Sequence, residues 1–171
     1  MNVLGQFTLA DRLYGEHKAE RLTVLTMPSG QASDGVRNSP EYAPLKAMLA
    51  EGWQEMEVID IDLQEDVQLT LFADRYYTIA KVWVNDAAKH RAYVKRAAET
   101  RAKLGMRILA SFTPTGYSSL DDSRSAPFAL VLVEWPAQAV TQQYLADPVL
   151  AEIREQQGST IKAIEWYGFR I

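Results

Sequence analysis

The residues best suited to chemistry in this chain are a histidine, a tyrosine and an arginine in its second half. His90 and Tyr93 lie in a predicted helix from Ala87 to Leu104, and Arg107 opens the strand that follows. Histidine can act as a general base near neutral pH, and arginine can hold a carboxylate or enolate bidentately. We take His90, Tyr93 and Arg107 as candidate catalytic residues and expect them to converge on one cavity. The alternatives are a hydrogen-bonded or solvated His90 and a structural ion pair of Arg107.

Aromatic residues provide candidate walls for a ligand pocket, although core packing is the alternative for most of them. Strand neighbours point to opposite faces, so only one of Tyr76 and Tyr77 can face a given side. Residues 114–127 predict a long turn-rich loop, which is either a lid or a solvated connection. The candidate ligand-binding residues are Tyr77, Trp83, Tyr117, Trp135 and Tyr144.

Composition excludes several classes of protein. The 171 residues are 47% apolar, which supports a core in one domain or two small ones. A net charge of −4 argues against nucleic-acid binding. We find no apolar run long enough for a membrane span and no signal peptide at the N-terminus. The chain has no cysteine, which excludes disulfides and thiol catalysis and fits a cytoplasmic protein.

Metal and cofactor binding are not expected. The two histidines, His17 and His90, are far apart in sequence and match no metal-ligand spacing. An acidic run tempts a metal interpretation, but we expect it to form a solvated face instead. Its members are Glu55, Glu57, Asp60, Asp62, Glu65 and Asp66.

Hydrophobic periodicity predicts alternating strands and helices along the chain. Strong signals include a strand at Tyr76–Val84 and the helix at Ala87–Leu104, capped by Asn85-Asp86 and ended by Gly105. The other predicted strands are 3–9, 21–27, 56–63, 67–72, 106–113, 128–135 and 161–167. The other predicted helices are 40–50, 138–145 and 147–157, and residues 10–20 are expected to be a hairpin connection.

A partial internal repeat organises these elements. Residues 22–46 align without a gap on residues 130–154, where Pro28 meets Pro136 and Pro40 meets Pro148. The second half has the order β-α-β-β-α-β, and the first half has β-β-α-β, the same unit without its first strand and helix. We therefore predict an α+β fold, with a partial ferredoxin-like repeat at 1–66 and a complete unit at 67–171. The first-copy strands should superpose on their second-copy counterparts.

Residues 76–168 resemble a bacterial family catalogued as domain of unknown function 1330, within the dimeric α/β-barrel superfamily. The likeness rests on the Tyr76-Tyr77 strand and on Asp86 with His90 and Tyr93. Three further segments are similar to the family: Gly105-Met106-Arg107, Glu134-Trp135-Pro136 and Asp147-Pro148. Met106 departs from the family pattern, which has a second glycine there. The resemblance implies a homodimer and a site between the sheet and its helices.

Three functions remain open at this point. The first is a small metal-free enzyme that transfers protons to, or oxygenates, an aromatic or enolic molecule at His90, Tyr93 and Arg107. The second is a non-catalytic, dimeric ligand-binding or stress-related module. The third is a haem-binding member of the superfamily. Fold alone does not choose among them.

Overall fold

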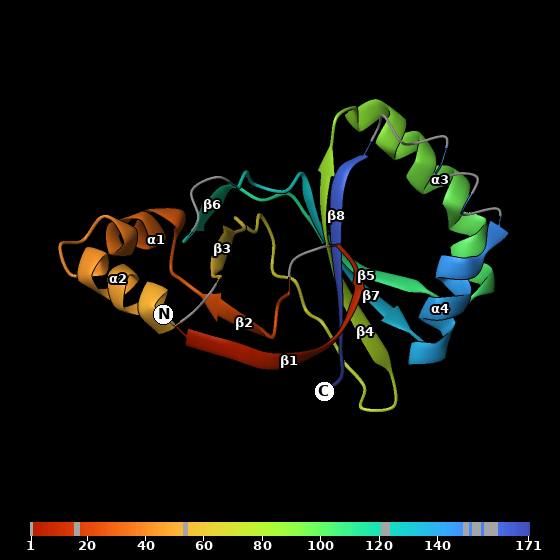
Figure 1. The fold of residues 1–171 in the computed structure, drawn as a ribbon, viewed down its shortest axis with the longest axis horizontal. Helices are drawn as coiled ribbons and strands as arrows, with labels where there is room; N and C mark the ends of the chain where they lie inside the picture. Colours follow the sequence, from red (N-terminus) through yellow and green to blue (C-terminus); the bar gives the residue numbers. More distant parts are fainter. Residues whose placement is uncertain are drawn as a thin grey trace.

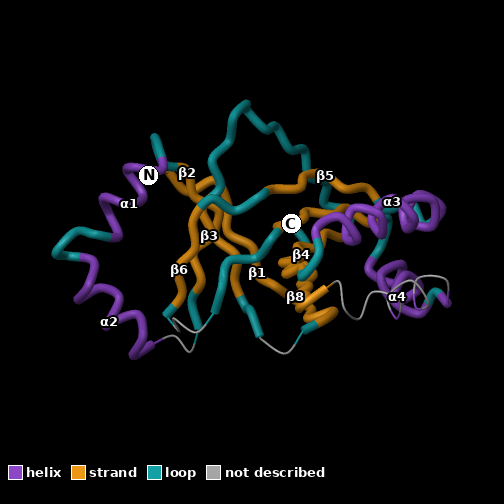
Figure 2. Tube along the Cα trace, turned by 90° about the horizontal axis from the view of Figure 1, so that it is seen from above, coloured by secondary structure: helices purple, strands orange, loops and turns teal. Residues whose placement is uncertain are grey.

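Two antiparallel sheets form the framework of the protein, and helices cover one side of the larger sheet (Figures 1 and 2). The structure is a computed structural model that describes residues 2–15, 18–52, 55–120, 124–148, 151, 155 and 161–171. Within these ranges the elements are β1 (Asn2–Tyr14), β2 (Arg21–Thr26), α1 (Gly30–Arg37), α2 (Tyr42–Gly52), β3 (Glu57–Asp60), β4 (Tyr76–Val84), α3 (Ala87–Lys103), β5 (Arg107–Phe112), β6 (Gly116–Ser119), β7 (Ala129–Trp135), α4 (Gln138–Ala146) and β8 (Ile161–Phe169). The predicted α+β class is confirmed.

The larger sheet has six strands in the order β2-β1-β8-β4-β7-β5. All pairings between the described strands are antiparallel, and β4 lies between β8 and β7. The smaller sheet pairs β3 with β6. Helices α3 and α4 lie on one side of the large sheet, whereas β3, β6, α1 and α2 lie on the other (Figures 1 and 2).

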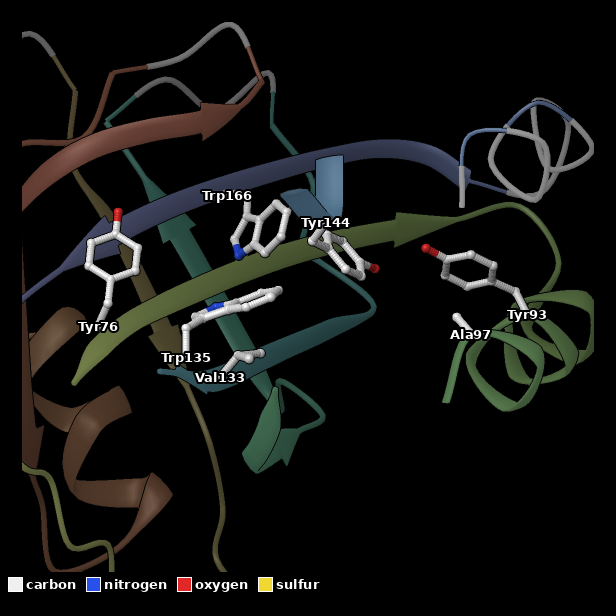
Figure 3. Packing of buried hydrophobic residues seen from close by; sticks show 7 residues of the cluster. All are labelled: Tyr76, Tyr93, Ala97, Val133, Trp135, Tyr144 and Trp166. Carbon is white, nitrogen blue, oxygen red and sulfur yellow. The ribbon is translucent and has the colours of Figure 1, made fainter. Parts of the chain in front are cut away.

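The core lies between the large sheet and its helices. Aromatic side chains from the strands meet Tyr93 and Ala97 of α3 and Tyr144 of α4, as Figure 3 shows. Trp135 is fully buried, and its indole N–H donates to the hydroxyl of Thr78 at 2.9 Å. Because a buried indole needs an acceptor, this bond fixes the ring in the core.

The elements with the clearest periodicity match their predictions. Strand β4 has the predicted bounds, and α3 begins after Asp86, whose carboxylate accepts from the backbone N–H groups of Ala88 and Lys89. Gly105 follows the helix with φ +69°, a conformation that favours glycine. Strands β5, β7 and β8 and helix α4 differ from the prediction by one or two residues.

Three predictions for segments outside the strongest helix and strand patterns are wrong. Residues 67–72 form no strand, and their apolar side chains Val67, Leu69 and Phe72 are exposed. The segment 114–127 is not simply a loop, because β6 lies within it. Residues 10–14 continue β1 instead of forming a connection, since Leu9 to Tyr14 pair with β8.

The first half also differs from the predicted copy of the second. An unpredicted helix, α1, begins after Ser29, whose hydroxyl accepts from the N–H of Ala32 at 3.2 Å. Strand β3 pairs with β6, whereas its counterpart β8 lies inside the large sheet. The three first-half strands therefore do not form one sheet, as their counterparts do. The predicted helix at 147–157 lies largely outside the described residues.

The large sheet crosses the predicted domain boundary at residue 66, because β1 pairs with β8. The described helices include none with the length and apolarity needed to cross a membrane.

Gly168 of β8 tests the packing of the sheet against its core. A Cβ at this position would overlap the hydroxyl of Tyr76, which is 1% exposed and donates to Asp11 at 2.7 Å. We expect Gly168→Ala to lower the free energy of unfolding by at least about 2 kcal/mol, because a buried ring has nowhere to move. Urea denaturation measures this.

The matched control is Gly35→Ala in α1, where a Cβ meets no atom within 4 Å. Alanine favours a helix over glycine by about 1 kcal/mol, so this variant should be neutral or slightly more stable. Equal effects of the two substitutions would contradict the packing described for Tyr76.

Candidate functional site

His90 lies in the first turn of α3, with its ring directed to the region between the helix and the sheet. The ring centroid is 6.1 Å from that of Tyr93 and 6.0 Å, edge-on, from that of Phe128. The Nδ1 atom is buried and has no hydrogen-bond partner within the described part of the chain. Burial, with the positive charge of Arg101 as a second cause, lowers the pKa of His90 below 6.5. The imidazole is therefore neutral at pH 7 and able to accept a proton.

Tyr93 belongs to a small polar group deeper in the same layer, which we call the tyrosine–arginine group: Tyr93, Arg101 and Tyr144. Arg101 donates to the hydroxyl of Tyr144 at 3.4 Å, and its guanidinium lies 5.2 Å from the ring of Tyr93. Figure 3 shows the two tyrosine hydroxyls directed toward each other. Burial and the contact with Tyr144 raise the pKa of Tyr93 to about 12, so its hydroxyl keeps its proton.

Arg107 does not join this group, so the predicted convergence of three catalytic residues is wrong. Its guanidinium donates to Glu134 at 3.0 Å, and the same carboxylate accepts from Tyr77 at 3.4 Å. Glu134 is next to Trp135, which faces the helices, and neighbouring residues of a strand point to opposite faces. Arg107 therefore lies on the face away from α3, with its side chain 66% exposed.

The candidate aromatic residues divide between the two faces of the sheet. Trp135 and Tyr144 belong to the helix-side core, where their rings meet edge-to-face at 5.3 Å. Tyr77 and Trp83 of β4 lie on the opposite face, and Tyr117 of β6 lies against it. The sequence expectation that one of Tyr76 and Tyr77 faces each side is confirmed, since Tyr76 is in the core.

The face of the large sheet away from α3 and α4 carries a buried charged cluster that the sequence analysis did not predict. We call it the charged cluster, and its members are Glu57, Lys81, Tyr117, Arg124, Glu165 and Tyr167. Lys81 of β4 forms ion pairs with both Glu57 and Glu165. Arg124 does the same, with its NH1 atom 2.7 Å from Glu57. The hydroxyl of Tyr117 donates to Glu57 at 2.7 Å.

Burial and pairing change the titration of this cluster. Burial alone would raise the pKa of Glu165, but Lys81, Arg124 and the Tyr167 hydroxyl hold it below its ordinary value. Burial and the bond to Glu57 raise the pKa of Tyr117 to about 12. The Glu165 carboxylate is therefore ionised at neutral pH. A shallow surface hollow adjoins the cluster and is lined by Glu55, Met56, Glu57, Ser119 and Arg124.

The expectation of a solvated acidic face is wrong for two of its members. Glu57 is 14% exposed within the charged cluster, and Asp60 is 19% exposed in an ion pair with Arg37 of α1. For Glu57, the signal in the sequence is its partner. Lys81 is the one charged residue of a largely apolar strand, and a buried lysine needs carboxylates nearby. Among the described residues, no three histidine, aspartate or glutamate side chains gather as a metal site.

Comparison with models of known protein families and with curated protein sequences gives no match for this chain.

The pKa of His90 tests the electrostatics of the helix side. We expect NMR titration of the imidazole to give a value below 6.5 in the wild type. Arg101→Gln should raise that pKa, because it removes a nearby positive charge, whereas Arg101→Lys should leave it low. A His17→Gln variant assigns the signals of the two histidines. A wild-type value at or above 6.5 would contradict the burial described for His90.

The lowered pKa of His90 also determines how the stability of the protein changes with pH. The folded protein holds the His90 proton more weakly than the unfolded chain does, so the contribution of His90 to stability is full above pH 6.5. It decreases as the pH falls from 6.5 to the folded pKa.

Proposed function

We propose that this protein acts on a small aromatic or enolic molecule by proton transfer at His90, between the large sheet and helices α3 and α4. The observation that carries the proposal is the buried Nδ1 atom of His90, which lacks a partner in the described chain. A buried ring nitrogen without a partner is costly unless a ligand or water uses it. A base with a lowered pKa is neutral at pH 7, as proton abstraction requires.

The surrounding residues suit an enol substrate. Neutral His90 takes the enol hydroxyl proton, and the imidazolium that forms then delivers a proton to the neighbouring carbon. One O–H bond breaks, one C–H bond forms, and His90 returns to its neutral state. Tyr93 keeps its proton at neutral pH and can donate a hydrogen bond to the developing enolate. Arg101 supplies positive charge, and the rings of Tyr93 and Phe128 favour a planar substrate. The scheme requires no metal.

A non-catalytic ligand-binding protein is the second candidate. It is favoured by the contacts of Arg101, whose guanidinium already meets Tyr93, the Tyr144 hydroxyl and the backbone carbonyl of Val94. A group whose donors are engaged within the protein can serve packing rather than chemistry. In that case substitution of His90 by alanine leaves ligand affinity intact.

We also propose that residues 76–169 form a ferredoxin-like unit of the dimeric α/β-barrel type, related to the family named above. Two interleaved crossings, β4-α3-β5 and β7-α4-β8, place four strands in the order β8-β4-β7-β5, which supports this assignment. We further propose that the chain pairs with a second copy of itself. Exposed apolar side chains of the first half support pairing: Val3, Leu4, Val24, Leu25, Leu45 and Met48.

Tautomerisation of phenylpyruvate tests the proton-transfer proposal. We expect the wild type to accelerate loss of the enol absorbance, and His90→Gln to lower kcat/KM by about 100-fold or more, as for loss of a general base. Arg107→Gln is the matched control, because this residue lies on the opposite face and should leave the rate unchanged. A wild type no faster than buffer, or a fully active His90→Gln variant, would overturn the proposal.

Light scattering tests whether two copies of the chain form a dimer. We expect twice the chain mass of 19.2 kDa, and a shift toward the single chain in Leu25→Glu, because a charge on β2 opposes burial of its exposed edge. Ile171→Glu, at an exposed isoleucine near the C-terminus, serves as the control and should remain dimeric. A wild-type mass of one chain at micromolar concentration would contradict pairing.

A further inference from the structure

The charged cluster is assembled from two separate parts of the fold. Lys81, Glu165 and Tyr167 belong to the large sheet, whereas Glu57 and Tyr117 belong to the small sheet of β3 and β6. Arg124 belongs with the large sheet, because the next residue, Ser125, accepts a hydrogen bond from the indole of Trp83 at 2.8 Å. Phe128 continues this attachment by donating its N–H to the carbonyl of Val82 at 2.7 Å.

The part that belongs to the large sheet carries an excess positive charge. Lys81 and Arg124 contribute two cations, and Glu165 contributes one carboxylate. These side chains are 9%, 15% and 5% exposed. A buried cation without a partner is costly, so this part requires one more anion. Glu57 supplies that anion from the small sheet.

The contacts of the Glu57 carboxylate are those that the carboxylate of a bound ligand would make. One oxygen accepts from Arg124 and from the Tyr117 hydroxyl, each at 2.7 Å, and the other oxygen pairs with Lys81. These three partners engage both oxygens of the carboxylate. Glu57 reaches them from a four-residue strand that pairs only with β6 in the described sheets.

Aromatic rings and a shallow hollow lie beside the Glu57 carboxylate. The ammonium of Lys81 lies 5.7 Å from the ring centroid of Trp83 and 5.5 Å from that of Tyr167. The guanidinium of Arg124 lies 6.0 Å from Trp83. The shallow hollow described above opens beside Glu57 and Arg124.

We propose that Lys81, Arg124 and their aromatic neighbours form a binding site for a small organic monocarboxylate, and that Glu57 of the same chain occupies it in this structure. A ligand carboxylate replaces that of Glu57 on Lys81 and Arg124, and its apolar body lies against Trp83. Binding then releases β3 from the large sheet. The site is on the face of the sheet opposite to His90, so it is separate from the proposed reaction centre.

Chemical rescue tests this site, with benzoate as the probe. Glu57→Ala should lower Tm, because it leaves Lys81 and Arg124 with one carboxylate fewer. Benzoate should then raise Tm by several degrees in a concentration-dependent manner, whereas chloride at equal ionic strength should not. Asp60→Ala, which removes another ion-paired carboxylate of β3, is the matched control and should respond equally to the two salts.

The indole N–H signal of Trp83 reports directly on the site. We expect benzoate to shift this signal in Glu57→Ala at lower concentration than in the wild type, because the wild-type site is already filled. A Trp83→Phe variant assigns the signal. If Glu57→Ala does not fold, Glu57→Gln provides the same comparison, because its uncharged amide leaves the cations unneutralised. Equal responses to benzoate and chloride, or an unmoved Trp83 signal, would overturn the proposal.

Discussion

Lys81 of β4 and Glu165 of β8 stand opposite each other in the antiparallel register, with side chains 9% and 5% exposed. Buried charges require partners, so an apolar layer could not cover this part of the sheet. Glu57 and Arg124 bring the second carboxylate and the second cation, which balances the cluster. The position of the small sheet over this face follows from that requirement, because Glu57 lies on β3.

The other face of the sheet follows ordinary packing rules. Alternation along the strands places Tyr76 and Trp135 on the helix side, where α3 and α4 cover them. His90 and the tyrosine–arginine group lie in this apolar layer, whose low polarity lowers the pKa of His90 and raises that of Tyr93. The two faces thus provide two chemically different sites: a neutral base among aromatic rings on one side, and a balanced set of charges on the other.

Helices and strands with strong local sequence signals were predicted correctly. The alternation of β4, the Asp86 cap of α3 and the glycine that ends this helix gave the correct segments, and helical spacing correctly placed His90 beside Tyr93. Long-range partners were not predictable in this way. Strand β6 is short and polar, so its pairing with β3 leaves no periodic pattern. The wrong prediction for Arg107 has the same origin. The face of the sheet on which Arg107 lies depends on its register with Glu134, and the spacing of residues along a helix carries no information about that register.

The central claim is that charges hold the small sheet against the large one, and a double-mutant cycle tests it most directly. Glu57→Gln and Lys81→Met, alone and together, should give a coupling of at least about 1 kcal/mol in the free energy of unfolding. Effects that add to within about 0.5 kcal/mol, as expected for Glu57→Gln with Arg107→Gln, would contradict it.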